Sequence, residues 1–364
     1  MRQLSAMNTL HFENNAPLES CNTFGIAARA RQLLRVQHPA QLQALAQQPD
    51  LLRQGLLVLG GGSNIVFTGN VQPLLLKIEI PGLALVGEDD THYIVQAGAG
   101  ESWHGLVAWT LQQGYAGLEN MALIPGTAGA APVQNIGAYG MELQDRFHSL
   151  DAIDIRTGRS FSLDAAQCGF SYRDSIFKRS PNDASAADGE SGLAGQAVIT
   201  HVRLALPKRW QPALGYLDIQ RKMAETGITN PTAQQVFDMV VAIRRAKLPD
   251  PANIGNAGSF FKNPVVSAEQ CARILAHEPA AVHYPLPDGR VKLAAGWLID
   301  ACGWRGKSMG NAGVYPKQAL VLINRYAETG VRATGAEVMA LAKAIQDSVH
   351  ARFGVQLEME PIVV

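Results

Sequence analysis

The chain has 364 residues, of which 47% are hydrophobic, and its 31 basic side chains balance its 31 acidic ones. This length accommodates two or three domains, and this apolar content excludes an intrinsically disordered chain. A net charge of zero argues against the overall electrostatic attraction on which nucleic-acid-binding and acidic-membrane-binding proteins depend. We therefore expect no nucleic-acid partner and no membrane partner.

The four cysteines, Cys21, Cys168, Cys271 and Cys302, lie far apart and form no Cys-x-x-Cys pair. This spacing differs from a zinc ribbon and from a disulfide framework, and it fits a reducing compartment. Residues 1–15 contain no apolar secretory stretch. No apolar run approaches the roughly 18 residues that a membrane-spanning helix needs. We expect a soluble, cytoplasmic, monomeric protein.

The hydrophobic pattern predicts short strands and helices in alternation. Strands are predicted at Leu56–Leu59, Leu74–Ile80, Tyr93–Ala97, Ser149–Arg156, Val198–Leu206 and Val355–Glu360. Helices are predicted at Pro39–Gln48, after the cap Ser102 as far as Gly114, and after three capping-box pairs, Thr232/Gln235, Ser267/Gln270 and Thr334/Glu337. The segment Ser180–Gly195 is rich in Ser, Ala, Asp and Gly and is interpreted as a surface loop without chemistry.

Two of these helices carry further signals. The helix after Thr232 should bury the stripe Val236, Met239, Val240 and Ile243, and the last helix should run to Phe353 and stop at Gly354. Because strands and helices are mixed without a regular β-α-β spacing, the predicted fold class is α+β rather than a doubly wound sheet.

Two glycine-rich segments are candidates for holding a cofactor. Gly60–Asn64 directly follows a predicted strand, and the second segment extends from Ile124 to Gly140. Glycines let backbone N–H groups approach an anion closely, so two such loops could hold the two ends of a pyrophosphate. Neither matches the Rossmann or P-loop fingerprint, and either alone is equally typical of an ordinary tight turn. Together they predict a dinucleotide cofactor.

Several long motifs in a fixed order resemble the UDP-N-acetylenolpyruvoylglucosamine reductase (MurB) family. They run from near the start to the final strand and include Asn22–Gly25, Phe170–Lys178, Lys247–Pro251, Asn256–Pro264 and Lys292–Asp300. The two glycine segments also resemble the flavin-binding loops of the vanillyl-alcohol-oxidase-type (PCMH) FAD domain. The resemblance implies FAD as cofactor and NADPH as hydride donor. Because neither glycine segment contains His or Cys, the FAD is expected to be non-covalent.

The resemblance also implies which residues bind FAD. They are Gly60, Gly61, Gly62, Ser63, Asn64, Ile65, Pro125, Gly126, Gly129, Gln134, Asn135, Gly137, Ala138 and Tyr139. No metal site is predicted, since His104, His201 and His283 are not spaced as zinc ligands.

The family reaction reduces the enolpyruvyl ether of a UDP-sugar to a lactyl ether. It needs stabilisation of negative charge on the substrate carboxylate and a positioned proton donor. The resemblance implies that Arg173 and Glu360 stabilise the charge and that Ser259 donates the proton. Judged without the resemblance, Arg173 is as well explained by an ion pair with Asp174, and Ser259 by an ordinary turn.

The closing motif leaves one choice open. Glu358 and Glu360 would lie on the same face of a strand, so alternation does not choose between them. Position in the motif favours Glu360. The chain also departs from the family pattern after this residue, because it ends Pro-Ile-Val-Val where the family has a Val-Arg continuation.

The resemblance assigns substrate binding to Tyr216, Lys247, Asn263, Tyr284, Lys292 and Gln318. A lone lysine is also typical of solvated surface. The segment Gln211–Asp218 resembles the mobile tyrosine loop of one subclass of the family, so Tyr216 is expected to close over the substrate as a lid.

The predicted organisation has three parts. Residues 1–82 with 351–364 form the first FAD subdomain, 83–232 form the second, and 233–350 form the substrate domain. Two other functions fit parts of the pattern. One is a PCMH-type oxidase of alcohols or sugars, and the other is a nucleotide-sugar-binding protein without catalysis.

Overall fold

The computed structural model describes residues 9–181 and 192–364. They form two compact units, each described by itself below. Unit 1 consists of the described parts of 1–16, 30–61 and 71–246, and unit 2 consists of 17–29, 62–70 and 247–364. The three-part organisation predicted above is finer and stays a prediction. Most of the predicted surface loop Ser180–Gly195 lies outside the described residues.

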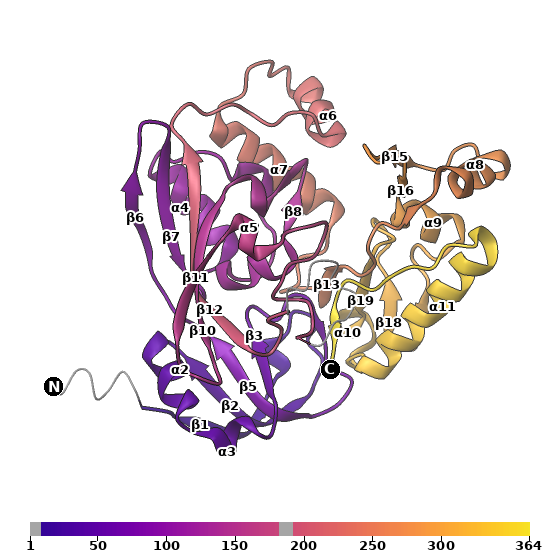
Figure 1. Cartoon of the computed structure of the whole chain (residues 1–364). Helices are drawn as coiled ribbons and strands as arrows, with labels where there is room; N and C mark the ends of the chain where they lie inside the picture. The colour runs from indigo at the N-terminus through magenta and orange to yellow at the C-terminus, as the bar shows by residue number, and fades with distance from the viewer. Residues whose placement is uncertain (1–8, 182–191) are drawn as a thin grey trace. The chain divides into compact units, whose positions relative to one another are not determined.

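Unit 1 contains two larger sheets (Figure 1) and a two-stranded one, in which β8 (Gly137–Ala138) pairs with β9 (Met141–Glu142). The first has the order β1-β2-β5-β3, with β5 parallel to both β2 and β3. The second has the order β11-β10-β12-β7-β6 and is antiparallel throughout. The strands of the first sheet are β1 (Phe12–Pro17), β2 (Arg29–Val36), β3 (Leu56–Leu59) and β5 (Val71–Ile78). Those of the second are β6 (Leu83–Glu88), β7 (His92–Gly98), β10 (Phe147–Asp154), β11 (Ser160–Asp164) and β12 (Ala197–Pro207).

Two clusters of buried hydrophobic side chains pack against these sheets. The larger one joins the five-stranded sheet to helices α4 (Trp103–Gln112) and α7 (Ala233–Lys247), through residues such as Trp103 and Val240. The smaller one joins residues of β2 and β5 to residues of β10 and β12, so side chains of both sheets share it. The remaining helices of unit 1 are α2 (Pro39–Ala46), α3 (Pro49–Leu52), α5 (Ala165–Cys168) and α6 (Leu217–Thr226).

Unit 2 is also mixed. Its largest sheet has the order β13-β19-β18-β17, a second has the order β14-β16-β15, and β20 pairs in parallel with β4. The strands are β4 (Ile65–Val66), β13 (Asn256–Ser259), β14 (Val265–Val266), β15 (His283–Pro285), β16 (Val291–Leu293), β17 (Ser308–Met309), β18 (Ala312–Val314), β19 (Val321–Asn324) and β20 (Ile362–Val363). The helices are α8 (Ala268–His277), α9 (Ala295–Ala301), α10 (Tyr326–Thr329) and α11 (Gly335–Phe353). The α+β prediction is confirmed in both units.

The helix signals in the sequence correspond to real caps. Thr232 and Gln235 cap each other at the start of α7, with contacts of 2.9 and 3.2 Å, and this helix buries the predicted stripe from Val236 to Ile243. Thr334 and Glu337 form the same box at α11, which ends at Gly354 with a φ of 63°. A left-handed glycine at this position is the usual helix stop.

The closing strand differs from its prediction. Instead of Val355–Glu360, the regular strand is β20, and the residues before it form only one isolated bridge, between Met359 and Phe261. Pro361 separates the bridge from β20, and a proline has no N–H to continue a hydrogen-bonded ladder.

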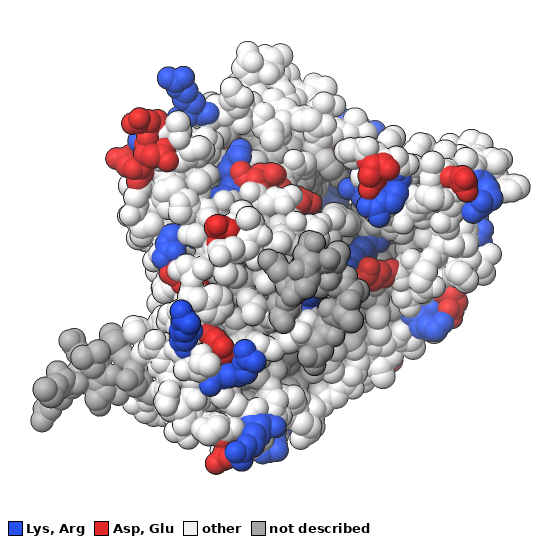
Figure 2. Space-filling view, in the orientation of Figure 1, with Lys and Arg blue, Asp and Glu red and all other residues white. Residues whose placement is uncertain are grey.

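The charge distribution agrees with the balanced composition. On the face shown in Figure 2, acidic and basic side chains lie in small mixed groups. No helix among the described residues is long and apolar enough to cross a membrane. In the same part of the chain, no three His, Cys, Asp or Glu side chains are grouped so that they could hold a metal ion.

Candidate functional site

The two glycine segments lie against each other. A Cβ atom at Gly61 would be 2.8 Å from the Cα of Gly126, and one at Gly60 would be 2.7 Å from the Oγ1 of Thr127. The contact at Gly61 is with backbone atoms and leaves no room for a side chain, so the backbones of the two segments approach each other directly at this point. Gly60 and Gly61, the part of the first segment that belongs to unit 1, therefore lie directly against the second segment.

The predicted FAD-binding residues divide between the two units. Gly60, Gly61, Pro125, Gly126, Gly129, Gln134, Asn135, Gly137, Ala138 and Tyr139 belong to unit 1, and Gly62, Ser63, Asn64 and Ile65 belong to unit 2. The boundary thus falls inside the first glycine turn. Gly62 has a φ of +66°, and a Cβ there would lie 1.9 Å from the carbonyl oxygen of Cys21, so this position also requires glycine.

Buried polar atoms that lack a hydrogen-bond partner within the protein indicate that unit 1 binds a polar ligand. Among the described residues, the buried side-chain atoms without a hydrogen-bond partner are Asn120 Oδ1, Thr127 Oγ1 and Arg244 Nε, and all three belong to unit 1. Such groups are rare because each carries the cost of desolvation. Thr127 lies within the second glycine segment, and the Arg244 side chain hydrogen-bonds that of Tyr139 in the same segment. Burial raises the pKa of Tyr139 to about 12, so its hydroxyl keeps its proton. These residues fit FAD.

Gly61→Ala is expected to reduce the FAD content of the purified protein severely. The added methyl group would force apart Gly61 and Gly126, and overpacking of this kind costs about 1–3 kcal/mol. Flavin absorbance per protein measures the effect. Gly69→Ala is the matched control, because a Cβ at Gly69 meets nothing within 4 Å. Equal flavin content in both variants would contradict the assignment of these loops.

The motif carrying Arg173 folds onto the second glycine segment at three points. Asn135 Nδ2 donates to the carbonyl of Ser171 at 3.2 Å, the Arg173 guanidinium donates to the carbonyl of Gly137 at 3.0 Å, and Ser175 Oγ donates to the carbonyl of Val133 at 2.7 Å. Asn135 also engages Glu142 and Gln144, so we assign its side chain to supporting the loop.

Arg173 itself is held in a strained backbone conformation with a φ of +58°. The left-handed backbone region costs a residue other than glycine about 1–2 kcal/mol. Such strain clusters at functional sites. Asp174, the neighbour considered as an ion-pair partner for Arg173, has its Oδ2 2.7 Å from the Nε of Arg179. Arg173 is therefore placed beside the cofactor loop.

In unit 2, Ser259 and Glu360 are brought close together. The Glu360 N–H donates to the carbonyl of Phe260, the residue after Ser259, at 2.9 Å. Ser259 ends β13, which begins at Asn256, and it is exposed, whereas Phe260 and Phe261 are fully buried and fix this strand. The Asn64 side chain donates to the carbonyl of Glu360 at 3.2 Å, which ties the glycine turn to the same place.

Glu358 and Glu360 differ in their exposure and in their contacts. Glu358 is exposed and forms an ion pair with Lys262, while its carbonyl accepts from the Lys262 N–H at 2.9 Å. Glu360 is half-buried. The Glu358 carboxylate is thus held in an ion pair at the surface, and the choice of Glu360 as the charge-stabilising residue stays a prediction. Arg173 belongs to unit 1, so its convergence with Ser259 and Glu360 stays a prediction.

Three of the predicted substrate residues, Tyr284, Lys292 and Asn263, lie on or beside neighbouring strands of unit 2. Tyr284 on β15 is directly opposite Lys292 on β16, and Asn263 accepts from the Ala295 N–H at 2.9 Å, just beyond the end of β16. Lys247 and Gln318 belong to the same unit but come from other segments, the end of α7 and the turn before β19. Tyr216 belongs to unit 1, where it is 43% exposed and precedes α6.

Arg244 was not predicted as a site residue from the sequence, although a signal exists. It lies four residues after Val240, on the same face as the buried stripe of α7. A charged residue in an apolar stripe is a candidate for function, because burial of its charge needs a compensating partner.

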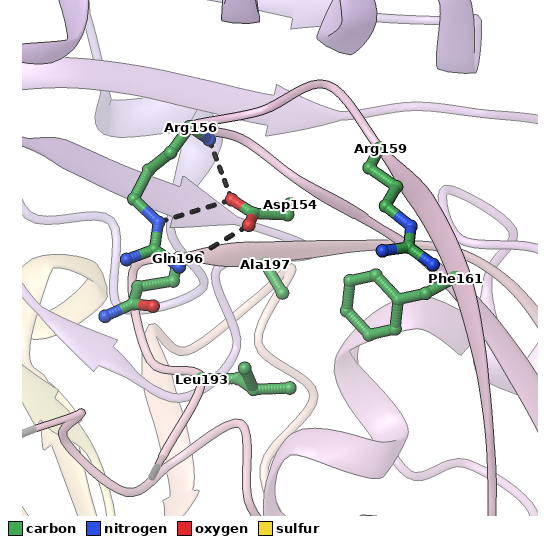
Figure 3. Close-up of a pocket in the computed structure, with 7 residues that line it drawn as sticks. All are labelled: Asp154, Arg156, Arg159, Phe161, Leu193, Gln196 and Ala197. Atoms are coloured by element: carbon green, nitrogen blue, oxygen red, sulfur yellow. Dashed lines mark hydrogen bonds and ion pairs between the residues drawn. The ribbon is translucent and has the colours of Figure 1, made fainter.

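A pocket elsewhere in unit 1 is not part of this site. It is lined by Asp154, Arg156, Arg159, Phe161, Leu193, Gln196 and Ala197 (Figure 3). Its main polar feature is the local pairing of Arg156 with Asp154 at 3.3 Å. None of its lining residues belongs to the predicted motifs.

Comparison with known proteins agrees with this geometry. The sequence profile for the UDP-N-acetylenolpyruvoylglucosamine reductase C-terminal domain matches residues 250–364, and that for an FAD binding domain matches residues 30–164. A crystal structure of UDP-N-acetylenolpyruvylglucosamine reductase (MurB) from Thermus caldophilus superposes with a TM-score of 0.63 at 22% identity, covering 98% of both chains. At this identity the superposition shows the shared fold.

Curated relatives are closer in sequence. The UDP-N-acetylenolpyruvoylglucosamine reductase of Burkholderia multivorans is 55% identical over 348 residues, which is 95% of each chain. That of Burkholderia lata is 53% identical over 357 residues, 98% of this chain and 97% of the relative. Identity of this level over 95% or more of both chains shows the family, and the chain belongs to the UDP-N-acetylenolpyruvoylglucosamine reductase (MurB) family.

Proposed function

We propose that this protein is an NADPH-dependent flavoenzyme that reduces UDP-N-acetylenolpyruvoylglucosamine to UDP-N-acetylmuramate, a precursor of peptidoglycan. The observation that carries the proposal is the 55% identity to a reductase of this name over 95% of both chains. The arrangement of the glycine segments and of Ser259 beside Glu360 is consistent with it.

FAD, when bound, supplies the hydride transfer from NADPH to the vinyl carbon of the substrate. The protein then has two tasks at the substrate. Arg173 binds the substrate carboxylate with its planar guanidinium, and Glu360 helps to stabilise the negative charge that develops there. The hydroxyl of Ser259 delivers a proton to the adjacent carbon. This step needs no histidine, because the carbon is basic enough to take the proton without prior activation of the hydroxyl.

Substrate binding is assigned to the group on unit 2 and to Tyr216. Lys292, next to Tyr284, and Lys247 supply cations for the diphosphate, while Asn263 and Gln318 supply amides for the sugar and the base. We assign Tyr216 to a lid over the substrate.

A direct experiment tests the function. Purified protein should be yellow, lose its colour with NADPH, and recover it anaerobically when the enolpyruvyl nucleotide sugar is added. A colourless protein that does not bind FAD would contradict a flavoenzyme. Recovery that requires oxygen would instead favour an oxidase, and nucleotide-sugar binding without turnover would favour a binding protein.

We propose a cytoplasmic location, supported by the four cysteines, all of which are free thiols in the structure. We also propose that the protein is a monomer. Sedimentation of the FAD-loaded protein at several concentrations tests the monomer.

Tyr216→Phe is expected to raise the KM for the nucleotide sugar about 2- to 10-fold, because one hydrogen bond is worth about 0.5–1.5 kcal/mol. The ring and its contacts remain, so kcat should change little. Tyr326→Phe is the control, since Tyr326 is 46% exposed, close to the 43% of Tyr216. An unchanged KM in Tyr216→Phe would remove Tyr216 from the substrate site.

A further inference from the structure

A buried polar pair occupies the short 3₁₀ turn η2 (Glu119–Met121) of unit 1. Glu119 is 1% exposed and Asn120 is fully buried. A carboxylate and an amide are seldom buried this completely unless their hydrogen bonds hold something in place. Neither residue belongs to the glycine segments or to the catalytic assignment.

Both residues hold the segment that leads to Tyr216. Glu119 Oε1 accepts from the Trp210 indole N–H at 2.6 Å, and its Oε2 accepts from the Gly117 N–H at 2.8 Å. Asn120 Nδ2 donates to the carbonyl of Ala213 at 2.8 Å. Two adjacent buried side chains therefore fix residues 210 and 213, and only Leu214 and Gly215 separate the second anchor from Tyr216.

Asn120 also holds the cofactor segment. The same Nδ2 donates to the carbonyl of Tyr139 at 3.0 Å. Tyr139 has a φ of +49°, and its ring meets the ring of Tyr216 edge-on, with centroids 5.1 Å apart. One amide group thus ties together the backbone of Tyr139 and the backbone that carries Tyr216, while the two rings pack against each other.

We propose that Glu119 and Asn120 are positioning residues for Tyr216. By anchoring Trp210 and Ala213 and by holding Tyr139, they limit the positions that the Tyr216 ring samples and so reduce the entropy lost when it closes on the substrate. This inference rests on the proposed function, in which Tyr216 binds the nucleotide sugar.

A double-mutant cycle on the FAD-loaded enzyme tests whether Asn120 acts through Tyr216. Asn120→Ser removes both donated hydrogen bonds and should raise the KM for the nucleotide sugar about tenfold, with kcat changed less than about twofold. Tyr216→Ala should raise the KM by at least as much. The double variant should match Tyr216→Ala alone, because the anchor has nothing left to position.

Two further variants complete the design. Trp210→Phe keeps an aromatic ring but loses the N–H that reaches Glu119, so it should raise the same KM, and only when Tyr216 is present. It carries the test if Asn120→Ser does not fold. Thr110→Val is the control, because it removes a buried hydrogen bond of the same unit, from Thr110 Oγ1 to the Val107 carbonyl at 2.9 Å, on helix α4.

The outcomes separate the two proposals. If the unaltered enzyme does not reduce the nucleotide sugar, the proposed function itself fails. If it does, effects of Asn120→Ser and Tyr216→Ala that multiply, to about a hundredfold in KM, overturn the positioning role. Loss of flavin from Asn120→Ser with an unchanged KM for the nucleotide sugar also overturns it.

Discussion

Ser259→Ala is expected to slow reoxidation of the NADPH-reduced protein by the nucleotide sugar about 10²- to 10⁴-fold, the range typical of a lost general acid. Bleaching of the flavin by NADPH should remain nearly normal, because that half-reaction requires no proton on the substrate carbon. Ser259 is exposed at the end of β13, where its hydroxyl is not needed to fill the core. Stopped-flow absorbance measures both half-reactions separately.

A serine with a purely structural role provides the control. Ser267 caps α8 by accepting from the Gln270 N–H at 3.1 Å. Ser267→Ala should lower the free energy of unfolding by about 1 kcal/mol and leave both half-reactions intact. If Ser259→Ala behaves in the same way, or if it loses FAD, then Ser259 is structural and the proton comes from another group.

Several helices of this protein could be predicted because their signals are local. The boxes at Thr232 and Thr334 and the stop at Gly354 each depend on a few neighbouring residues, and the structure contains all three. The buried apolar stripe of α7 could be predicted in the same way, because a period of 3.6 residues determines which side chains share a face of the helix. The proximity of the glycine loops is a tertiary contact, and it was expected only because both loops suited one ligand.

Other features depend on contacts that no local pattern encodes. Asp174 pairs with Arg179, five residues away, and the Arg173 guanidinium donates to the carbonyl of Gly137. The closing strand was predicted several residues before its observed position, Ile362–Val363. The alternation of apolar and polar residues before Pro361 resembles a strand, but in this stretch only Met359 forms a bridge, to Phe261. The anchors Glu119 and Asn120 gave no signal, because burial of a polar residue becomes visible only when its partners are known.

Glu360→Ala is expected to lower the rate of nucleotide-sugar reduction about 10²- to 10³-fold, as removal of one preorganised group beside a developing charge usually does. The backbone of Glu360 is held from two sides, by its N–H to Phe260 and by the Asn64 side chain at its carbonyl. Loss of the side chain should therefore leave the strand in place, and the FAD content and melting temperature should change little.

Glu358→Ala is the control for Glu360→Ala, because it removes a carboxylate two residues away that has no predicted role in catalysis. It breaks the ion pair with Lys262, in which the Glu358 side chain is 70% exposed, and exposed pairs are worth about 0–1 kcal/mol. Its turnover should stay within about threefold of the unaltered enzyme. Glu360→Gln adds a finer comparison: partial activity would indicate that Glu360 acts as a hydrogen-bond donor, which an amide can imitate. If instead Glu358→Ala is the inactive variant, the assignment of Glu360 from its position in the motif is wrong, and Glu358 is the charge-stabilising residue.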